Sequence, residues 1–368
     1  MVTRRQFLLS SMATTGGLAT VSACSSGTTT DSYEHAVSRT WRHAKVDEGN
    51  KPAILRELVR YATLAPSSHN TQCWKFRVEA SSVSVLPDFS RRCPAVDPDD
   101  HHLFVSIGCA TENLVQAALA NGLHANAIFD SSSGGKLRLS SEPTKAVASA
   151  LFNAIPERQS TRGEYDGKPI STNELALLER AGTGNGVQVA LLTERAAMER
   201  VLEYVVQGNT AQMNDRAFVE ELKAWIRFSS SDAVRTGDGL YSASSGNPSV
   251  PSWLGSFLFG LFFTPKNEND KYAKHVRSSS GIAVFVSETE SPAQWIEVGR
   301  CYERFALQST ALGIRNAMLN QPVEVTALRP QFATFLGLGG RRPDLVVRFG
   351  RGPKMLPSLR RPVEAVLT

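Results

Sequence analysis

The sequence predicts an α+β protein whose two halves repeat one order of elements. Three observations support this prediction: a helix, hairpin and helix in the first half, the same order in the second half, and a composition suited to ordinary cores. The chain has 368 residues, of which 42% are hydrophobic and 20% charged, as is typical of globular proteins. It is therefore long enough for one large domain, or for two domains with a buried core each.

In the first half, hydrophobic periodicity and loop residues mark each element. The order is helix, polar loop, two strands of a hairpin and a long helix, at residues 52–65, 67–72, 74–78, 83–86 and 102–122. The long helix has an apolar stripe and the small residues Gly108, Cys109 and Ala110. Small side chains permit close approach to a neighbour, so this helix is expected to be central and buried.

The second half repeats this order. A helix, a strand, a long helical stretch, an apolar strand, a buried helix and a last core strand are predicted at 173–181, 187–192, 196–224, 281–286, 292–312 and 345–350. Residues 236–264 mix Gly, Ser and Pro with six aromatic side chains. Such a segment is more typical of a lid or a partner surface than of a linker, with a buried connecting loop as the alternative.

The N-terminus is better explained as a targeting segment than as part of the fold. Arg4 and Arg5 precede a weakly apolar stretch ending at Ala23, which resembles a twin-arginine export signal. Ser, Thr and Gly make this stretch too polar for a stable membrane span. Because this route exports folded proteins, often with a cofactor, we expect a bound cofactor.

The four residues Val21-Ser22-Ala23-Cys24 resemble a lipobox, in which Cys24 becomes the lipidated first residue. Plain secretion after Ala23 is the alternative. We expect a signal at 1–23, a tether at 24–50, and a periplasmic or cell-envelope protein anchored at Cys24, whose only link to the membrane is this signal or lipid.

Charge and cysteine spacing give no indication of nucleic-acid or metal binding. The net charge of +5 is mild and the basic residues are scattered, which argues against nucleic acid. The remaining cysteines at 73, 93, 109 and 301 show no paired spacing, and there is no C-x-x-C. The adjacent His101 and His102 are not expected to share one ligand face of a helix or strand. We therefore expect no metal site.

Two motifs resemble those of nitroreductase-family flavoproteins. The segment Ala65-Pro66-Ser67-Ser68-His69-Asn70-Thr71-Gln72-Cys73-Trp74-Lys75-Phe76 is similar to the family's A-P-S-x-x-N-x-Q-P-W-x-F loop. The segment Arg158-Gln159-Ser160-Thr161-Arg162-Gly163-Glu164-Tyr165 is similar to its R-x-S-x-R-x-[FY] element, and the tail at 356–364 to its closing basic motif. Together these motifs span almost all of residues 52–368.

The order of the motifs indicates a fused dimer. In ordinary family members the arginine element precedes the loop in one short subunit, and two subunits build each flavin site. Here the loop comes first and each motif occurs once, as in the Acg-like branch. The resemblance implies a nitroreductase-like fold with pseudo-symmetric halves at 51–155 and 156–368, one FMN site, a vestigial second site, and a monomer acting as a pseudo-dimer.

The resemblance implies that the FMN ligands lie on loops, where forked guanidinium groups suit phosphate and short polar groups suit the ribityl chain. The expected cofactor-binding residues are Pro66, Ser67, Ser68, Asn70, Gln72, Arg158, Ser160, Arg162, Asn320, Gln321, Arg360 and Arg361. No protein acid or base is assigned, since the ring performs the redox chemistry. Cys73 replaces the family's proline; an inert, half-buried thiol is the expectation and a redox centre the alternative.

The implied activity is hydride transfer from NAD(P)H through flavin N5 to a nitroaromatic, quinone or similar acceptor. The alternative is an FMN-binding or flavin-sequestering protein with little turnover, in which the aromatic segment covers the ring. Export to a compartment poor in NAD(P)H keeps this alternative open. A third interpretation is oxidation of a bound small molecule by oxygen.

Overall fold

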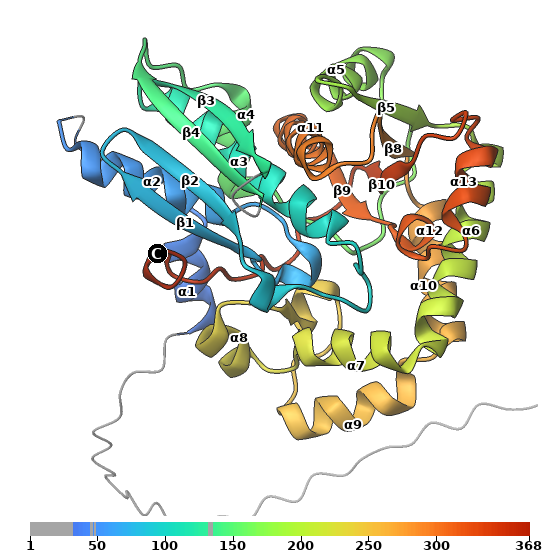
Figure 1. Ribbon diagram of the computed structural model, residues 1–368. Coiled ribbons are helices and arrows are strands. Elements are labelled where there is room, and N and C mark those ends of the chain that lie inside the picture. The colour runs from blue at the N-terminus through green and yellow to red at the C-terminus, as the bar shows by residue number, and fades with distance from the viewer. Residues whose placement is uncertain (1–31, 45–46, 48, 132–134) are drawn as a thin grey trace, which may run out of the picture. The chain divides into compact units, whose positions relative to one another are not determined.

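The computed structural model describes residues 32–44, 47, 49–131 and 135–368. The predicted signal and Cys24 lie outside these residues. Ser32–Thr368 forms one compact unit, in which two sets of elements follow the same order (Figure 1).

The first set is a four-stranded antiparallel sheet with its helices. Its elements are α2 Lys51–Thr63, β1 Trp74–Glu79, β2 Ser82–Pro87, α3 His101–Ala120, β3 Leu123–Asp130, β4 Lys136–Pro143 and α4 Ala150–Ala154. The strand order is β1-β2-β4-β3. Trp74 and Phe76 of β1 point into the core and are fully buried, whereas Lys75 and Arg77 alternate outward.

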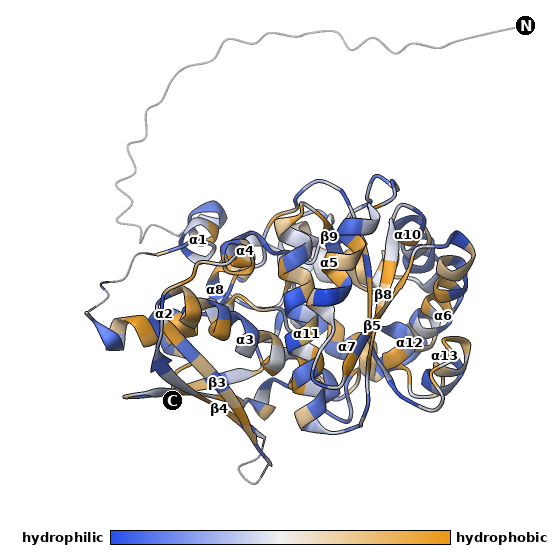
Figure 2. Ribbon diagram, turned by 90° about the horizontal axis from the view of Figure 1, so that it is seen from above, coloured by the Kyte–Doolittle hydropathy of each residue, from blue (hydrophilic) through white to orange (hydrophobic). Residues whose placement is uncertain are grey.

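The second set repeats this topology. Its elements are α5 Thr172–Gly182, β5 Val187–Leu192, β8 Gly281–Ser287, α11 Pro292–Ala311, β9 Arg315–Met318, α12 Gln321–Glu324, α13 Arg329–Phe335 and β10 Pro343–Gly350. The strand order β5-β8-β10-β9 matches that of the first sheet position by position. Every residue of β8 is buried, as its apolar run predicts, and Figure 2 shows hydrophobic colour along β5 and β8. The predicted α+β class with two similar halves is confirmed.

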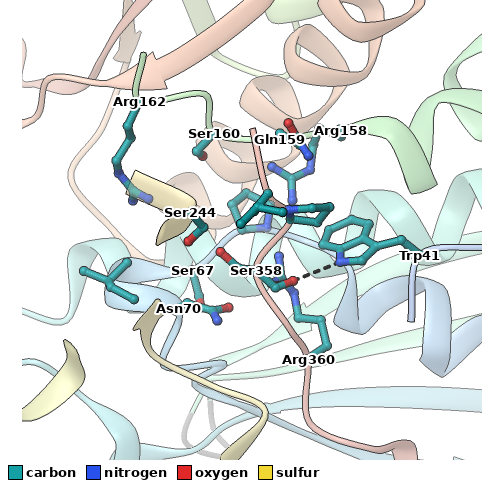
Figure 3. Close-up of a pocket in the computed structure, with 14 residues that line it drawn as sticks. Trp41, Ser67, Asn70, Arg158, Gln159, Ser160, Arg162, Ser244, Ser358 and Arg360 are labelled. Carbon is teal, nitrogen blue, oxygen red and sulfur yellow. Dashed lines mark hydrogen bonds between the residues drawn. The ribbon is translucent and has the colours of Figure 1, made fainter. Parts of the chain in front are cut away.

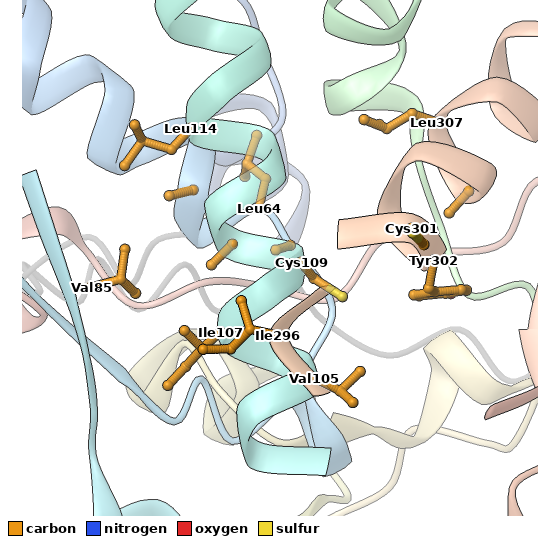
Figure 4. Close-up of a cluster of buried hydrophobic side chains, with 14 of the residues drawn as sticks. Leu64, Val85, Val105, Ile107, Cys109, Leu114, Ile296, Cys301, Tyr302 and Leu307 are labelled. Atoms are coloured by element: carbon orange, nitrogen blue, oxygen red, sulfur yellow. The ribbon is translucent and has the colours of Figure 1, made fainter. Parts of the chain in front are cut away.

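Helices α3 and α11 join the halves through a close backbone contact (Figure 4). Gly108 is the eighth residue of α3, and Gly299 is the eighth residue of α11. A Cβ atom on Gly108 would lie 2.0 Å from the carbonyl oxygen of Ile296, and one on Gly299 would lie 1.9 Å from that of Val105. The crossing is therefore pseudo-symmetric, and only glycine fits on either side.

A large insertion separates the first two strands of the second sheet, counted along the chain. β1 and β2 are joined by two residues, whereas β5 and β8 are joined by residues 193–280. The insertion contains α6 Arg195–Asn214, α7 Arg216–Trp225, β6 Ile226–Arg227, α8 Ser230–Thr236, β7 Leu240–Tyr241, α9 Ser252–Phe262 and α10 Pro265–Arg277. The predicted helical stretch at 196–224 is two helices, because Asp215 ends α6 and caps α7. The aromatic segment at 236–264 is thus one part of a longer insertion.

Residues within the predicted tether form a packed helix. α1 spans Tyr33–Thr40, and its Tyr33 is buried against Tyr241 and Leu359. The structure therefore differs from a free tether over these residues. This short helix has only two buried positions, Tyr33 and Ala36, so its sequence shows no clear apolar period.

The C-terminal tail crosses from the second half to the first. The Phe76 amide donates to Val366 O at 2.7 Å, and the Thr368 amide donates to Phe76 O at 2.9 Å. Of the described helices, α3 alone is long and apolar enough to cross a membrane, and most of it is buried inside the protein as a core helix.

Candidate functional site

A pocket lies where the loop after α2, the arginine element and the tail meet (Figure 3). The insertion also contributes to it. The lining residues are Trp41, Pro66, Ser67, Asn70, Arg158, Gln159, Ser160, Arg162, Leu240, Ser244, Leu356, Pro357, Ser358 and Arg360.

The loop after α2 is held in an unusual backbone conformation. His69, Asn70 and Gln72 have φ values of 48°, 53° and 53°, a region that Asn and His occupy more readily than most residues. The Asn70 amide group donates to Gly239 O at 2.9 Å and to Leu359 O at 3.2 Å. The loop is thereby fixed to both the insertion and the tail.

Gln72 strengthens the same connection. Its Nε2 donates to Gly237 O at 2.8 Å, and its Oε1 accepts from the Arg361 amide at 2.9 Å. Gln72 is fully buried and does not line the pocket. Its role in the structure is therefore to position the loop.

Two of the arginines predicted to bind the phosphate already form hydrogen bonds with other parts of the protein. Nη2 of Arg158 donates to Leu64 O at 2.8 Å, and its Nε lies 3.2 Å from Oε1 of Glu303. Arg360 donates to the carbonyl oxygens of five residues, Thr63, Leu64, Ala65, Ser358 and Leu359, and lies over the Trp41 ring. Both guanidinium groups line the pocket, but their donors mainly hold the end of α2 and the tail.

Arg162 is the arginine that remains available. Within the described part of the chain, its guanidinium has no hydrogen bond or ion pair, and it extends along the pocket wall that carries Ser244 (Figure 3). Burial lowers its pKa. Asn70 Oδ1 is likewise buried and without a partner. An unpaired cation and an unpaired acceptor in one pocket favour a polar, anionic ligand.

Five predicted site residues do not line the pocket. These are Ser68, Gln72, Asn320, Gln321 and Arg361. Asn320 Oδ1 accepts from the Val346 amide at 3.0 Å, and Gln321 Nε2 donates to the Tyr272 hydroxyl at 2.5 Å. Each of these two side-chain amides thus has a protein partner outside the pocket, while Gln321 Oε1 is buried without one.

Several lining residues were not predicted as ligands. Trp41, Leu240 and Ser244 lie in segments interpreted as tether and lid, where no motif marks them. The other four unpredicted lining residues lie inside the quoted motifs: Gln159, Leu356, Pro357 and Ser358. Their nearness in sequence to Ser160 and Arg360 is the signal by which they could be predicted. No residue of α9 lines the pocket, and its Trp253 and Phe257 are exposed.

The second half contains charged contacts that match those of Arg158 in the first half. Glu112 and Glu303 are each the twelfth residue of their helices, α3 and α11. Glu303 faces Arg158, whereas Glu112 pairs with Arg304 at 3.2 Å, and Arg304 also donates to Ala181 O at 3.2 Å. Arg304 thus contacts the end of α5 much as Arg158 contacts the end of α2. The glycine-rich loop after α5 carries one amide side chain, Asn185, which has φ of 52° and donates to Glu297 at 2.8 Å.

Glu303 is a buried acid that the sequence did not mark. It is completely buried, and this burial raises its pKa to about 7 against the opposing effect of Arg158. Cys73 is 2% exposed, and burial raises the pKa of its thiol to about 12. The structure therefore favours the inert-thiol interpretation of Cys73.

The chain is similar in sequence to known proteins that share one name. No protein-family model matches the chain. It is 25% identical over 311 residues to a Mycobacterium tuberculosis protein provisionally named NAD(P)H nitroreductase Rv3131, covering 81% of this chain and 85% of that protein. It is 22% identical over 328 residues to a second, provisionally named NAD(P)H nitroreductase acg, covering 85% and 95%.

Solved structures give weaker matches. A Desulfitobacterium hafniense nitroreductase with bound FMN matches at a TM-score of 0.38 and 15% identity, covering 60% of this chain and 98% of that chain. The FMN-dependent nitroreductase NfnB of Mycobacterium smegmatis, solved with NADPH, matches at 0.37 and 15%, covering 58% and 93%. The chain is thus similar, over more than four-fifths of its length, to two proteins that bear the name NAD(P)H nitroreductase.

Proposed function

We propose that the chain is an FMN-dependent oxidoreductase of the nitroreductase family, with one flavin site at the pocket between the loop after α2, the arginine element and the tail. One observation carries the proposal. Arg162 and Asn70 Oδ1 are unpaired in a pocket lined by seven of the twelve residues expected to bind FMN, namely Pro66, Ser67, Asn70, Arg158, Ser160, Arg162 and Arg360. The similarity to the two nitroreductase-named proteins supports it.

Each pocket residue has a distinct part in this proposal. Arg162 would bind the phosphate, because its guanidinium offers forked donors with no competing partner. Asn70 Oδ1 and the Ser67 and Ser160 hydroxyls would accept or donate hydrogen bonds to the ribityl chain and ring edge. Arg158 and Arg360 would hold the carbonyl groups at the end of α2 in place, and would add positive charge. When bound, FMN supplies the hydride chemistry from NAD(P)H to a nitroaromatic, quinone or similar acceptor.

A phosphate-selective loss of affinity tests the role of Arg162. FMN and riboflavin are titrated into the flavin-free chain and into Arg162→Gln, with Arg200→Gln as a control for an exposed arginine on α6 paired with Glu203. Losing a charged hydrogen bond costs about 1.5–3 kcal/mol, so FMN binding should weaken by about 10- to 100-fold. Riboflavin lacks the phosphate, and its affinity should not change. Equal weakening for both flavins, or none for FMN, would refute the assignment.

Flavin sequestration is a second candidate, and one observation favours it. Leu240 and Ser244 of the insertion line the pocket. The carbonyl oxygens of Gly237 and Gly239 accept hydrogen bonds from Gln72 and Asn70 of the loop after α2. An insertion fixed there covers part of the pocket. Anaerobic NADPH distinguishes the two: rapid bleaching of the flavin absorbance indicates a reductase, whereas bleaching by dithionite alone indicates a covered flavin.

For the N-terminus, we propose twin-arginine export and lipidation at Cys24. The residue pattern Arg4-Arg5 and Val21–Cys24 supports this proposal. Cell fractionation of the chain and of Cys24→Ser tests it. Lipidation requires the unmodified protein to be in the membrane fraction and the variant to be in the soluble exported fraction; the same distribution for both would contradict it.

A further inference from the structure

Three potential metal ligands from distant parts of the chain meet at the loop after α2, called the flavin loop below (residues 67–72). His69 lies in η1 (Ser68–Asn70), Cys93 follows η2 (Phe89–Arg91), and Glu221 lies on α7 of the insertion. One ligand atom from each lies within 4.8 Å of the other two. We infer that His69, Cys93 and Glu221 form a binding site for a divalent cation of the zinc class.

The imidazole of His69 is suited to donate a lone pair. Its Nε2 is buried and has no hydrogen-bond partner. Burial and the nearby positive charge of Arg162 lower its pKa to about 4, so the ring is neutral at physiological pH, as a metal ligand must be. Its backbone has φ of 48°, a left-handed conformation that His tolerates better than most residues.

The other two ligands are held next to one another. Glu221 accepts hydrogen bonds from the amides of Ala95 at 2.9 Å and Val96 at 3.2 Å, two and three residues after Cys93. A carboxylate has about four acceptor positions, so two remain for a cation. Cys93 is 4% exposed, and the acidic groups of Glu221, Asp97 and Glu324 add to burial in raising its pKa. A cation relieves this accumulation of acidic groups.

The donor set selects the kind of ion. One imidazole nitrogen, one thiolate and one carboxylate form a three-ligand set that zinc accepts with a fourth position open. The thiolate disfavours Mg²⁺ and Ca²⁺, which prefer oxygen. Binding converts the thiol to a thiolate with release of one proton, and the two negative ligands then balance the two positive charges.

A neighbouring cluster of one aspartate and two histidines is partly paired with other groups. Ligand atoms of Asp97, His101 and His102 also lie within 4.8 Å of one another, contrary to the expectation that the two histidines cannot share a ligand face. Both Asp97 oxygens accept backbone amides at the start of α3, and His101 Nε2 lies 2.9 Å from Asp344. These groups anchor the first turn of α3, so the inference is restricted to His69, Cys93 and Glu221.

A bound ion would add a second connection between the insertion and the flavin loop, besides the hydrogen bonds of Asn70 and Gln72. A bound ion would connect α7 to the loop that carries Asn70 and Gln72. The inference does not depend on FMN binding, since none of its three ligands lines the pocket.

Cobalt is the probe that tests the site, because it reports thiolate ligation by colour. The full chain is freed of metal with a chelator under anaerobic conditions, and Co²⁺ is added to one equivalent. We expect a thiolate-to-cobalt charge-transfer band in the near ultraviolet, which one equivalent of Zn²⁺ abolishes. A wild-type chain that shows no such band, or a band that Zn²⁺ leaves unchanged, would overturn the inference whatever the variants do.

Matched variants assign the ligands. His69→Asn keeps a side chain tolerant of the left-handed backbone, Cys93→Ser keeps the shape of the thiol, and Cys301→Ser is the control, as another buried free cysteine. Zn²⁺ affinity should fall at least 10-fold in the first two and stay unchanged in the control. Circular dichroism checks that each variant is folded. Folded His69→Asn and Cys93→Ser with wild-type affinity would overturn the assignment.

Discussion

The crossing of α3 and α11 gives a quantitative test of how the two halves are joined. In Gly108→Ala, the new methyl group would lie 2.0 Å from the Ile296 carbonyl oxygen, whereas real contacts are essentially never closer than 3.0 Å. The helices must therefore separate by about 1 Å, the difference between these distances. The obstructing atoms are backbone, so no side chain can rotate away, and we expect a loss of about 3 kcal/mol or more in the free energy of unfolding.

Denaturant unfolding of Gly108→Ala, Gly299→Ala and the double variant measures this loss. Both substitutions open the same crossing, so the double variant should lose much less than the sum of the two. Gly260→Ala is the control, because Gly260 lies inside α9 with no atom within 4 Å of the added methyl group; it should gain about 0.5–1 kcal/mol from helix propensity. Losses below about 1 kcal/mol, or additive losses, would refute the close crossing.

Three further predictions follow from the buried polar groups. Arg360→Ala leaves the carbonyl groups of Thr63 and Ala65 without their side-chain donor and should destabilise the fold by about 3 kcal/mol. Arg360→Lys should not restore the stability because lysine lacks the fork. Thermal unfolding measures both variants, and a wild-type melting temperature for Arg360→Ala would contradict the assigned contacts. The raised pKa of Glu303, about 7 against 4.5 in the unfolded chain, means that the folded state holds its proton longer and loses stability as pH rises between these values. Glu303→Gln removes this titration, so the unfolding free energy of the variant minus that of the wild type should rise from pH 5 to pH 8. A difference that does not change with pH would contradict the raised pKa of Glu303. The native Cys73 thiol, whose pKa burial raises to about 12, should resist iodoacetamide at pH 8 and react after unfolding, as mass spectrometry of the labelled peptide would show; rapid native labelling would instead restore the redox interpretation.

Strong periodic elements could be predicted from the sequence alone. The strand at 187–192 was predicted with its observed bounds, and the two buried helices within one or two residues, because long apolar patterns depend little on tertiary context. β9 and α1 were not predicted. β9 has four residues and α1 has two buried positions, so neither leaves a periodic signal.

The pocket could be predicted in part, for a physical reason. The motifs identified the segments that meet, but the sequence does not show which donor of an arginine is already used. Arg158 and Arg360 are consumed by carbonyl groups of residues 63–65, contacts that span about 300 residues of sequence in the case of Arg360. Removing this pair would therefore be expected to disturb the fold as well as the site, whereas Arg162 reports on the ligand alone.

The flavin content of the purified chain tests the central claim most directly. The chain is saturated with FMN, freed of excess, and denatured, and the released flavin is compared with the chain concentration from amino-acid analysis. Because each motif expected to form the flavin site occurs once in the chain, the account predicts one FMN per chain. Two FMN per chain, or none, would contradict it.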